Sequence, residues 1–178
     1  VNMEVHSQNK LTELVTSLES ERSLRLLAFS LAAHDLSSQE PFSPRKQAVE
    51  RLQTEDRAIL ADAFRAKLLN LEMEFGSSRQ DSLMELLLRR LGYTYVSLSD
   101  KITISRIPSS SQIRVQGYGY TPEMSTYMVN SFCEEFIRYQ LTVEQERLES
   151  SISLLSQITN QKRFELEEKS ARLRGERQ

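Results

Sequence analysis

The chain has 178 residues, with 23 Lys and Arg against 25 Asp and Glu, and this length fits one domain or one domain with an extension. The net charge of −2 argues against nucleic-acid binding, which needs an excess of basic side chains to neutralise phosphates. One cysteine, Cys133, excludes an internal disulfide and a cysteine-rich metal site. No run of about 20 apolar residues is present, so none of these residues is expected to span a membrane.

Apolar residues at helical spacing predict a first helix from about Lys10 to His34. The polar stretch 19–23 inside it indicates either a solvated middle or a short break. A second helix is predicted over 43–75, with Pro44 in its first turn. It divides into two helices if the acidic stretch that begins at Thr54 starts a new one.

A third helix is predicted over 79–91, with its core-facing residues at Leu83, Leu86, Leu87 and Leu91 and a stop at Gly92. The period then changes to two in 101–105 and 112–116, which predicts half-buried strands. The polar connection between them suits an antiparallel hairpin. Two strands alone are marginal, so a further strand is needed, and residues 1–5 are a weak candidate.

The last segment is predicted to be one long helix. Thr121, Pro122 and Glu123 are typical of an N-cap, a first helical position and an acidic first turn. The 52 residues of 123–174 contain no Gly or Pro, and as a helix they would rise about 78 Å, more than the diameter of a small domain. We therefore expect the helix to extend out of the domain. Its first part has a broad apolar face, which is made by Met124, Met128, Phe132, Phe136 and Tyr139 together with Val129, Cys133 and Ile137.

Beyond Val143 the apolar face narrows to one row, which consists of Leu141, Leu148, Ile152, Leu155 and Ile158. Such a row predicts contact with one partner helix or a neighbouring protomer rather than with a core, although Lys162 interrupts the heptad. From Glu144 onward seven acidic residues balance seven basic ones. The sequence thus predicts an α+β fold in which a small antiparallel sheet packs against helices. Residues 1–145 would form a base domain, and 146–178 the start of a helical protrusion.

The sequence offers few candidates for catalytic or metal-binding residues. His6 and His34 are isolated, and Cys133 on an apolar stripe is expected to be a buried, inert thiol. We therefore predict no catalytic, cofactor-binding or metal-binding residue and no enzyme. The residues His34 and Asp35 are interpreted as a solvated helix end.

Two other groups of residues leave a choice. Tyr93, Tyr95, Tyr118 and Tyr120 are interpreted as packing residues of the strand region, with a glycan contact as the less favoured alternative. The basic pairs 45–46 and 89–90 are interpreted as solvated helix faces. They would otherwise meet anionic sugars, lipid headgroups or a neighbouring protomer.

A family resemblance follows from the strands and the start of the last helix. The stretches 91–107 and 111–115, then Pro122 with Asn130 eight residues later, resemble the periplasmic domain of polysaccharide chain length determinant proteins. These are the Wzz-type co-polymerases for exopolysaccharides and lipopolysaccharides, whose domain also occurs in bacterial tyrosine autokinases. Thr121 departs from the family's usual Asp, and the family's two membrane helices are not among these residues.

The resemblance implies a non-catalytic module on the periplasmic side of the bacterial inner membrane. It implies a ring of protomers that regulates the chain length or export of an O-antigen, capsule or exopolysaccharide together with the polymerase or export machinery. Because the chain begins at Val1 rather than Met, we expect an excised fragment whose membrane anchors lie elsewhere in a longer protein. The alternative is a soluble cytoplasmic coiled-coil adaptor with a small α/β docking module.

Overall fold

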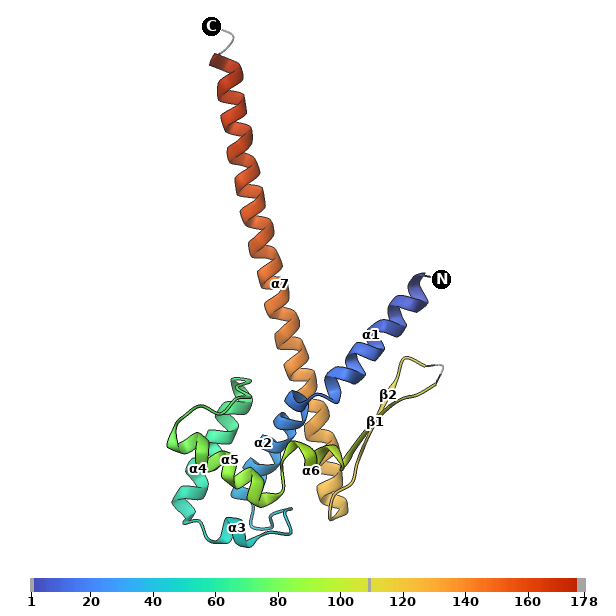
Figure 1. Ribbon diagram of the computed structural model, residues 1–178, viewed down its shortest axis with the longest axis vertical. Coiled ribbons are helices and arrows are strands. Elements are labelled where there is room, and N and C mark those ends of the chain that lie inside the picture. Colours follow the sequence, from blue (N-terminus) through green and yellow to red (C-terminus); the bar gives the residue numbers. More distant parts are fainter. Residues whose placement is uncertain (1, 109, 176–178) are drawn as a thin grey trace. The chain divides into compact units, whose positions relative to one another are not determined.

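The computed structural model describes residues 2–108 and 110–175, with side chains between residues 9 and 172. The chain forms two compact units, an N-terminal unit of residues 1–137 and a C-terminal unit of residues 138–178. The predicted boundary at residue 145, between a base domain and a helical protrusion, stays a prediction. The elements in chain order are α1 (Asn2–Leu18), α2 (Glu21–Ser37), α3 (Gln47–Glu50), α4 (Thr54–Leu69), α5 (Arg79–Leu91), α6 (Tyr95–Ser99), β1 (Ile102–Arg106), β2 (Ile113–Gly117) and α7 (Pro122–Gly175) (Figure 1).

The predicted α+β class is confirmed, because the described residues are mostly helical and contain one small sheet and a long C-terminal helix. The sheet has the order β1-β2 and is antiparallel, with Ile104 opposite Val115. Each strand begins one residue later than predicted. Helices α1 and α6 pack beside β1, whose Ile102 is buried. No third strand occurs among residues 2–108 and 110–175, so helices alone stabilise the hairpin.

The break in the first predicted helix is confirmed. Helix α1 ends at Leu18 and α2 begins at Glu21, after Ser20. The Ser20 hydroxyl accepts a hydrogen bond from the backbone N–H of Ser23 at 3.3 Å and so caps α2. The strand candidate at 1–5 is wrong for residues 2–5, which belong to α1, while Val1 lies outside the described residues. Among residues 2–5, Met3 and Glu4 favour a helix, against one β-branched residue, Val5.

The second predicted helix is two helices, as the alternative of a restart at Thr54 predicted. Its predicted start near Ser43 is wrong, because the chain becomes helical only at Gln47. Its predicted end at 75 is also wrong, because α4 ends at Leu69. The loop after α4 instead carries Phe75 against Phe29 of α2, with their ring centroids 5.5 Å apart.

The predicted bounds of α5 are confirmed, and Gly92 ends the helix with φ +79°. This left-handed backbone suits glycine, which has no Cβ to clash with the preceding turn. Leu87 and Leu91 are buried as expected. Leu83 and Leu86 are not buried, since their exposed fractions are 46% and 43%. Helix α5 therefore leaves part of its apolar surface uncovered.

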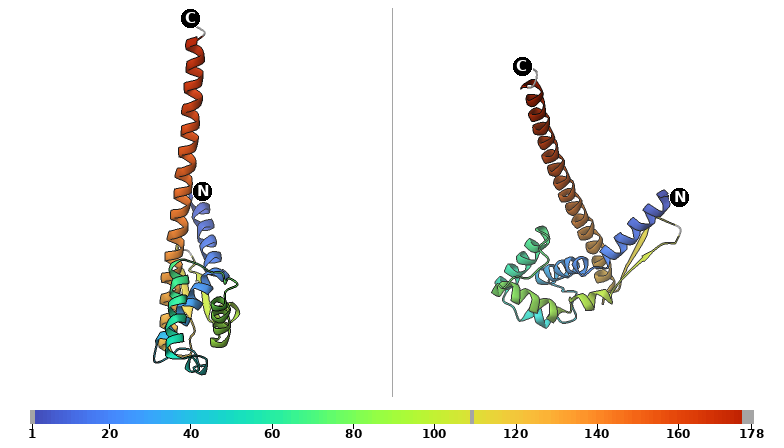
Figure 2. Two further views of the ribbon diagram at one scale, coloured as in Figure 1. Left: turned by 90° about the vertical axis from the view of Figure 1, so that its left-hand side faces the viewer. Right: turned by 45° about the horizontal axis from the view of Figure 1, so that its top comes forward.

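The core lies around α2, which packs against α4, α5 and α6 (Figures 1 and 2). The α2 side chain of Phe29 is fully buried and meets Phe64 of α4 with ring centroids 5.6 Å apart. The start of α7 joins the same core, because the hydroxyls of Ser30 and Tyr127 lie 3.0 Å apart. One buried helix thus organises the whole N-terminal unit.

Candidate functional site

The N-terminal unit buries a carboxylate, that of Asp35, at the end of α2. This carboxylate accepts hydrogen bonds from the backbone N–H groups of Phe42 at 2.7 Å and Ser43 at 3.0 Å, and from the Tyr93 hydroxyl at 2.6 Å. Asp35 is 0% exposed, so the interpretation as a solvated helix end is wrong. Sequence spacing missed this residue because its partners lie seven, eight and 58 positions away.

The hydrogen bonds of Asp35 belong to a buried network that includes Tyr93 and Ser43. Tyr93 is buried, and this burial, followed by the negative charge of Asp35, raises the pKa of the Tyr93 phenol far above its usual range. Ser43 extends the network by donating from its hydroxyl to the Leu91 carbonyl at 2.9 Å. Three segments of chain are thereby tied to α2, and every polar group in the network has a partner.

The other residues weighed for chemistry are dispersed. His34 stacks on Phe42 with ring centroids 4.0 Å apart, in the N-terminal unit. Cys133 is half-buried rather than buried, and its burial, followed by the charge of Glu134, raises the pKa of its thiol. Within the described part of the chain no group of three or more His, Cys, Asp or Glu side chains is placed to hold a metal ion.

The first four turns of α7 belong to the N-terminal unit and bury a continuous apolar stripe. The hydroxyl of Thr121 accepts from the backbone N–H of Met124 at 3.2 Å, which is the predicted N-cap with Pro122 at the first helical position. Burial is complete or nearly so at Met124, Met128, Phe132 and Phe136. Ile137, which sequence analysis placed on this face, is 57% exposed. Asn130 also lies exposed on α7.

The C-terminal unit carries the predicted contact residues on the remainder of α7. The residues Leu141, Leu148, Ile152 and Leu155, which we call the α7 apolar row, are between 63% and 66% exposed. At 100° per residue they lie within one narrow strip of the helix surface. Full burial of one such side chain is worth about 1.5–3 kcal/mol, so contact of this row with a partner would be favourable. No residue between 144 and 164 is even half-buried.

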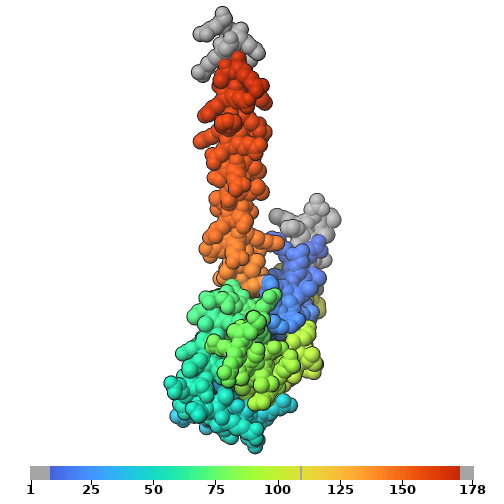
Figure 3. Space-filling view, turned by 60° about the vertical axis from the view of Figure 1, so that its left-hand side comes forward, coloured from blue at the N-terminus to red at the C-terminus, as the bar shows by residue number. Residues whose placement is uncertain are grey.

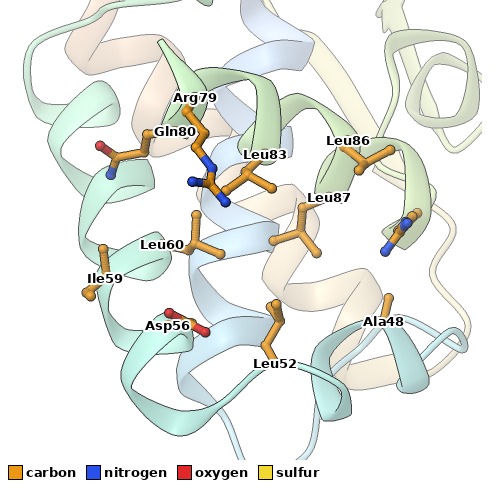
Figure 4. Close-up of a pocket in the computed structure, with 11 residues that line it drawn as sticks. Ala48, Leu52, Asp56, Ile59, Leu60, Arg79, Gln80, Leu83, Leu86 and Leu87 are labelled. Atoms are coloured by element: carbon orange, nitrogen blue, oxygen red, sulfur yellow. The ribbon is translucent and has the colours of Figure 1, made fainter.

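A second uncovered apolar surface lies in the N-terminal unit, between α4 and α5. The space-filling view shows the face that these two helices form (Figure 3), and the close-up shows side chains from both converging on a hollow of about 590 Å³ (Figure 4). We call this hollow the α4–α5 groove. Its apolar lining is Leu52, Ile59, Leu60, Leu83, Leu86 and Leu87. Ile59 is 55% exposed, and with Leu83 and Leu86 it makes the groove the main unfilled apolar surface on this face.

Basic side chains border the groove. Arg79 and Arg90 line it from the two ends of α5, and Arg90 also lines an adjoining hollow with Arg45, Lys46 and Arg51. The sequence singled out 45–46 and 89–90 as basic pairs but gave no sign that two of these residues meet, because 45 positions separate them. In the structure the Arg45 guanidinium donates to the Arg90 carbonyl at 3.5 Å.

The four tyrosines of the strand region differ in burial. Tyr93 is a packing residue, as the favoured interpretation predicted, whereas Tyr95, Tyr118 and Tyr120 are 44–58% exposed. The ammonium of Lys101 lies 4.0 Å from the ring centroid of Tyr120, which is a cation–π contact. No pocket that we describe joins these exposed rings.

Comparisons with known proteins add no relative: no protein-family model, no curated protein and no solved structure matches this chain. Among the described helices, none is both long enough and apolar enough to cross a membrane.

Proposed function

We propose that this chain is an assembly module, in which the α7 apolar row binds a partner helix and brings copies together. The observation that carries the proposal is the exposure of Leu141, Leu148, Ile152 and Leu155 on one strip of a continuous helix. A helix that keeps such a row in water loses free energy that a partner would recover. The buried stripe earlier on α7 belongs to the packed N-terminal unit, whereas this row belongs to the C-terminal unit.

The resemblance to polysaccharide chain length determinants suggests the biological role of this assembly. We propose a non-catalytic module of a polysaccharide co-polymerase, a homo-oligomer on the periplasmic side of the bacterial inner membrane. It would regulate the chain length or export of a surface polysaccharide through its polymerase or export machinery. The order of hairpin, Thr121 cap and long α7 helix agrees with the pattern on which the resemblance rests.

The assembly is tested by sedimentation velocity across a range of concentrations. We expect wild type to self-associate, and Ile152→Asp in the row to remain monomeric because it places a charge in the contact. Leu154→Asp is the matched control, because Leu154 is also exposed, at 57% against 66% for Ile152, but lies on another side of the helix. A monomeric wild type at all concentrations contradicts the proposal.

The polysaccharide role needs a separate measurement in cells. The gene is replaced by wild type, Ile152→Asp or Leu154→Asp, and the lengths of the surface polysaccharide are compared on gels. We expect Ile152→Asp to broaden or shift the length distribution, and Leu154→Asp to leave it unchanged. An unchanged distribution with Ile152→Asp, together with lost assembly, would favour the coiled-coil adaptor.

A further inference from the structure

The α4–α5 groove and the α7 apolar row have opposite charge at their borders. The α4–α5 groove and its adjoining hollow are lined by five basic side chains and two acidic ones. Among the described residues, Arg79, Arg90, Lys46 and Arg51 take part in no ion pair. The border therefore carries an excess of positive charge, five basic side chains against two acidic ones.

The shape of the groove suits a helix of about three turns. On α5, Arg79, Leu83, Leu86 and Arg90 fall within one strip of the helix at 100° per residue. The two arginines are eleven positions apart, which corresponds to about 16 Å along the axis. The groove thus offers leucines in its middle and a positive charge at each end. An amphipathic helix with acidic flanks is the ligand that such a surface recognises.

The 141–155 segment of α7 is an amphipathic helix with exposed acidic residues beside its apolar row, one of which, Glu144, pairs with Arg147 at 3.5 Å. The α7 apolar row spans 141–155, about 21 Å of helix, and Glu144 and Glu149 flank it on its two sides at 100° per residue. Within 141–155 there are three acidic residues and one basic residue, Arg147. Both glutamates are exposed.

We propose that the α4–α5 groove of one copy binds the 141–155 segment of α7 from a second copy. This inference rests on the assembly function proposed above and names the surface that receives α7. The contact is heterologous, since each copy offers two different surfaces and engages both. Repetition of such a contact produces rings when its rotation closes and chains when it does not. A symmetric α7–α7 pair would stop at two copies and would leave the groove empty.

Complementation between two damaged copies tests this arrangement. Leu83→Asp places a charge in the α4–α5 groove and leaves the α7 apolar row unchanged. Leu148→Asp places a charge in the α7 apolar row and leaves the groove unchanged. We expect wild type to assemble beyond a dimer in sedimentation velocity and each variant alone to remain monomeric. An equimolar mixture should form a one-to-one dimer and nothing larger, because only one intact groove and one intact α7 remain per pair. Circular dichroism with a thermal melt checks that both variants fold.

The possible failures separate the two proposals. Assembly of Leu83→Asp at wild-type strength overturns the groove inference and leaves assembly through α7 standing. Two monomeric variants whose mixture is also monomeric overturn the groove inference too, because the intact surfaces then do not bind each other. A monomeric wild type overturns both proposals.

A charge exchange gives a second, independent test that does not alter the apolar residues. Reversing Arg79 and Arg90 to Glu should weaken association at least about tenfold, and so should reversing Glu144 and Glu149 to Lys. Combining all four changes in one chain should restore association to within about threefold, because each contact is attractive again. Arg89→Glu is the matched control, since Arg89 neighbours Arg90 but pairs with Glu85 on another side of α5. Combined reversal that binds no better than either half alone contradicts the proposed contact.

Discussion

The hydroxyl of Tyr93 donates a 2.6 Å hydrogen bond to the carboxylate of Asp35, which is 0% exposed. This bond joins the start of the loop after α5 to the end of α2, and the same carboxylate receives two backbone N–H groups of the loop after α2. A buried charge is tolerated only where hydrogen bonds compensate it, and here three donors, the N–H groups of Phe42 and Ser43 and the Tyr93 hydroxyl, do so. One buried side chain therefore links the loop after α2 to the loop after α5.

Removing either partner of this bond should destabilise the N-terminal unit. Tyr93→Phe deletes one hydrogen bond to a charged group and should cost about 1.5–3 kcal/mol in the free energy of unfolding. Asp35→Ala should cost more, about 3–5 kcal/mol, because it also leaves buried N–H groups unpaired. Urea unfolding followed by circular dichroism measures both. Tyr95→Phe is the control, since Tyr95 is 44% exposed, and a loss as large as that of Tyr93→Phe there would contradict this account.

The ion pair between Lys67 and Asp81, 3.0 Å apart, should make stability fall in acid. Hydrogen bonds from Lys67 and then from Ser78 lower the pKa of Asp81 below its ordinary value of 3.8. A carboxyl group whose pKa is lower in the folded state stabilises the fold above the unfolded pKa, and this contribution disappears as the pH falls through the folded pKa. Asp81→Asn should therefore melt at a lower temperature than wild type at pH 7, and the two melting temperatures should converge as the pH falls through the lowered pKa of Asp81 in the folded state.

The matched control for the acid prediction is Asp62→Asn. Asp62 pairs with Arg65 at 2.8 Å, but its side chain is 75% exposed, and pairs of this kind contribute little to stability. Its melting curve should follow wild type over the same pH range. A gap between wild type and Asp81→Asn that stays constant from pH 7 to pH 2 would show that the carboxylate charge is not the cause.

Local patterns in the sequence were enough to predict much of the fold. The bounds of α5, the hairpin, the break before α2 and the cap of α7 each depend on residues within a few positions of one another. The wrong predictions share another origin. Asp35 and Ser43 were misread because their partners are distant in sequence, and Leu83 was placed in the core because helical spacing does not reveal which stripe a neighbouring helix covers.

The candidate site was likewise predictable only where it depends on residues close together in the sequence. The α7 apolar row is one strip of one helix, and its residues were predicted from spacing alone. The α4–α5 groove combines the loop around Leu52 with two helices whose packing distance sets its volume, and no pattern within one segment contains that information. The meeting of Arg45 with Arg90 is likewise a product of the fold.

The two stretches of α7 should respond differently to truncation of a large side chain. Phe132→Ala empties a position that is 1% exposed and should cost about 3–5 kcal/mol in the free energy of unfolding. Leu155→Ala, at a position 63% exposed, should change stability by no more than about 0.5 kcal/mol in dilute monomeric protein. Urea unfolding at low and high protein concentration measures both. Should Leu155→Ala prove as costly as Phe132→Ala in the dilute protein, the row would have a partner within its own chain.

Gly119 should tolerate alanine less well than Gly92, for a different physical reason. A Cβ at Gly119 would lie 2.8 Å from the Cβ of Met124 and from the backbone nitrogen of Ser125, so the start of α7 would have to shift. This overpacking should cost about 2–3 kcal/mol and weaken the hydrogen bond that the Gly119 N–H donates to the Ser125 hydroxyl at 2.8 Å. At Gly92 nothing lies within 4 Å, and only the left-handed backbone at φ +79° opposes a side chain, at a cost of about 1 kcal/mol. Thermal melts of Gly119→Ala and Gly92→Ala give the ranking, and hydrogen exchange at the first turn of α7 should increase for Gly119→Ala alone. An equal loss in the two variants, with α7 exchange unchanged, would mean that the loop before α7 yields without disturbing the helix.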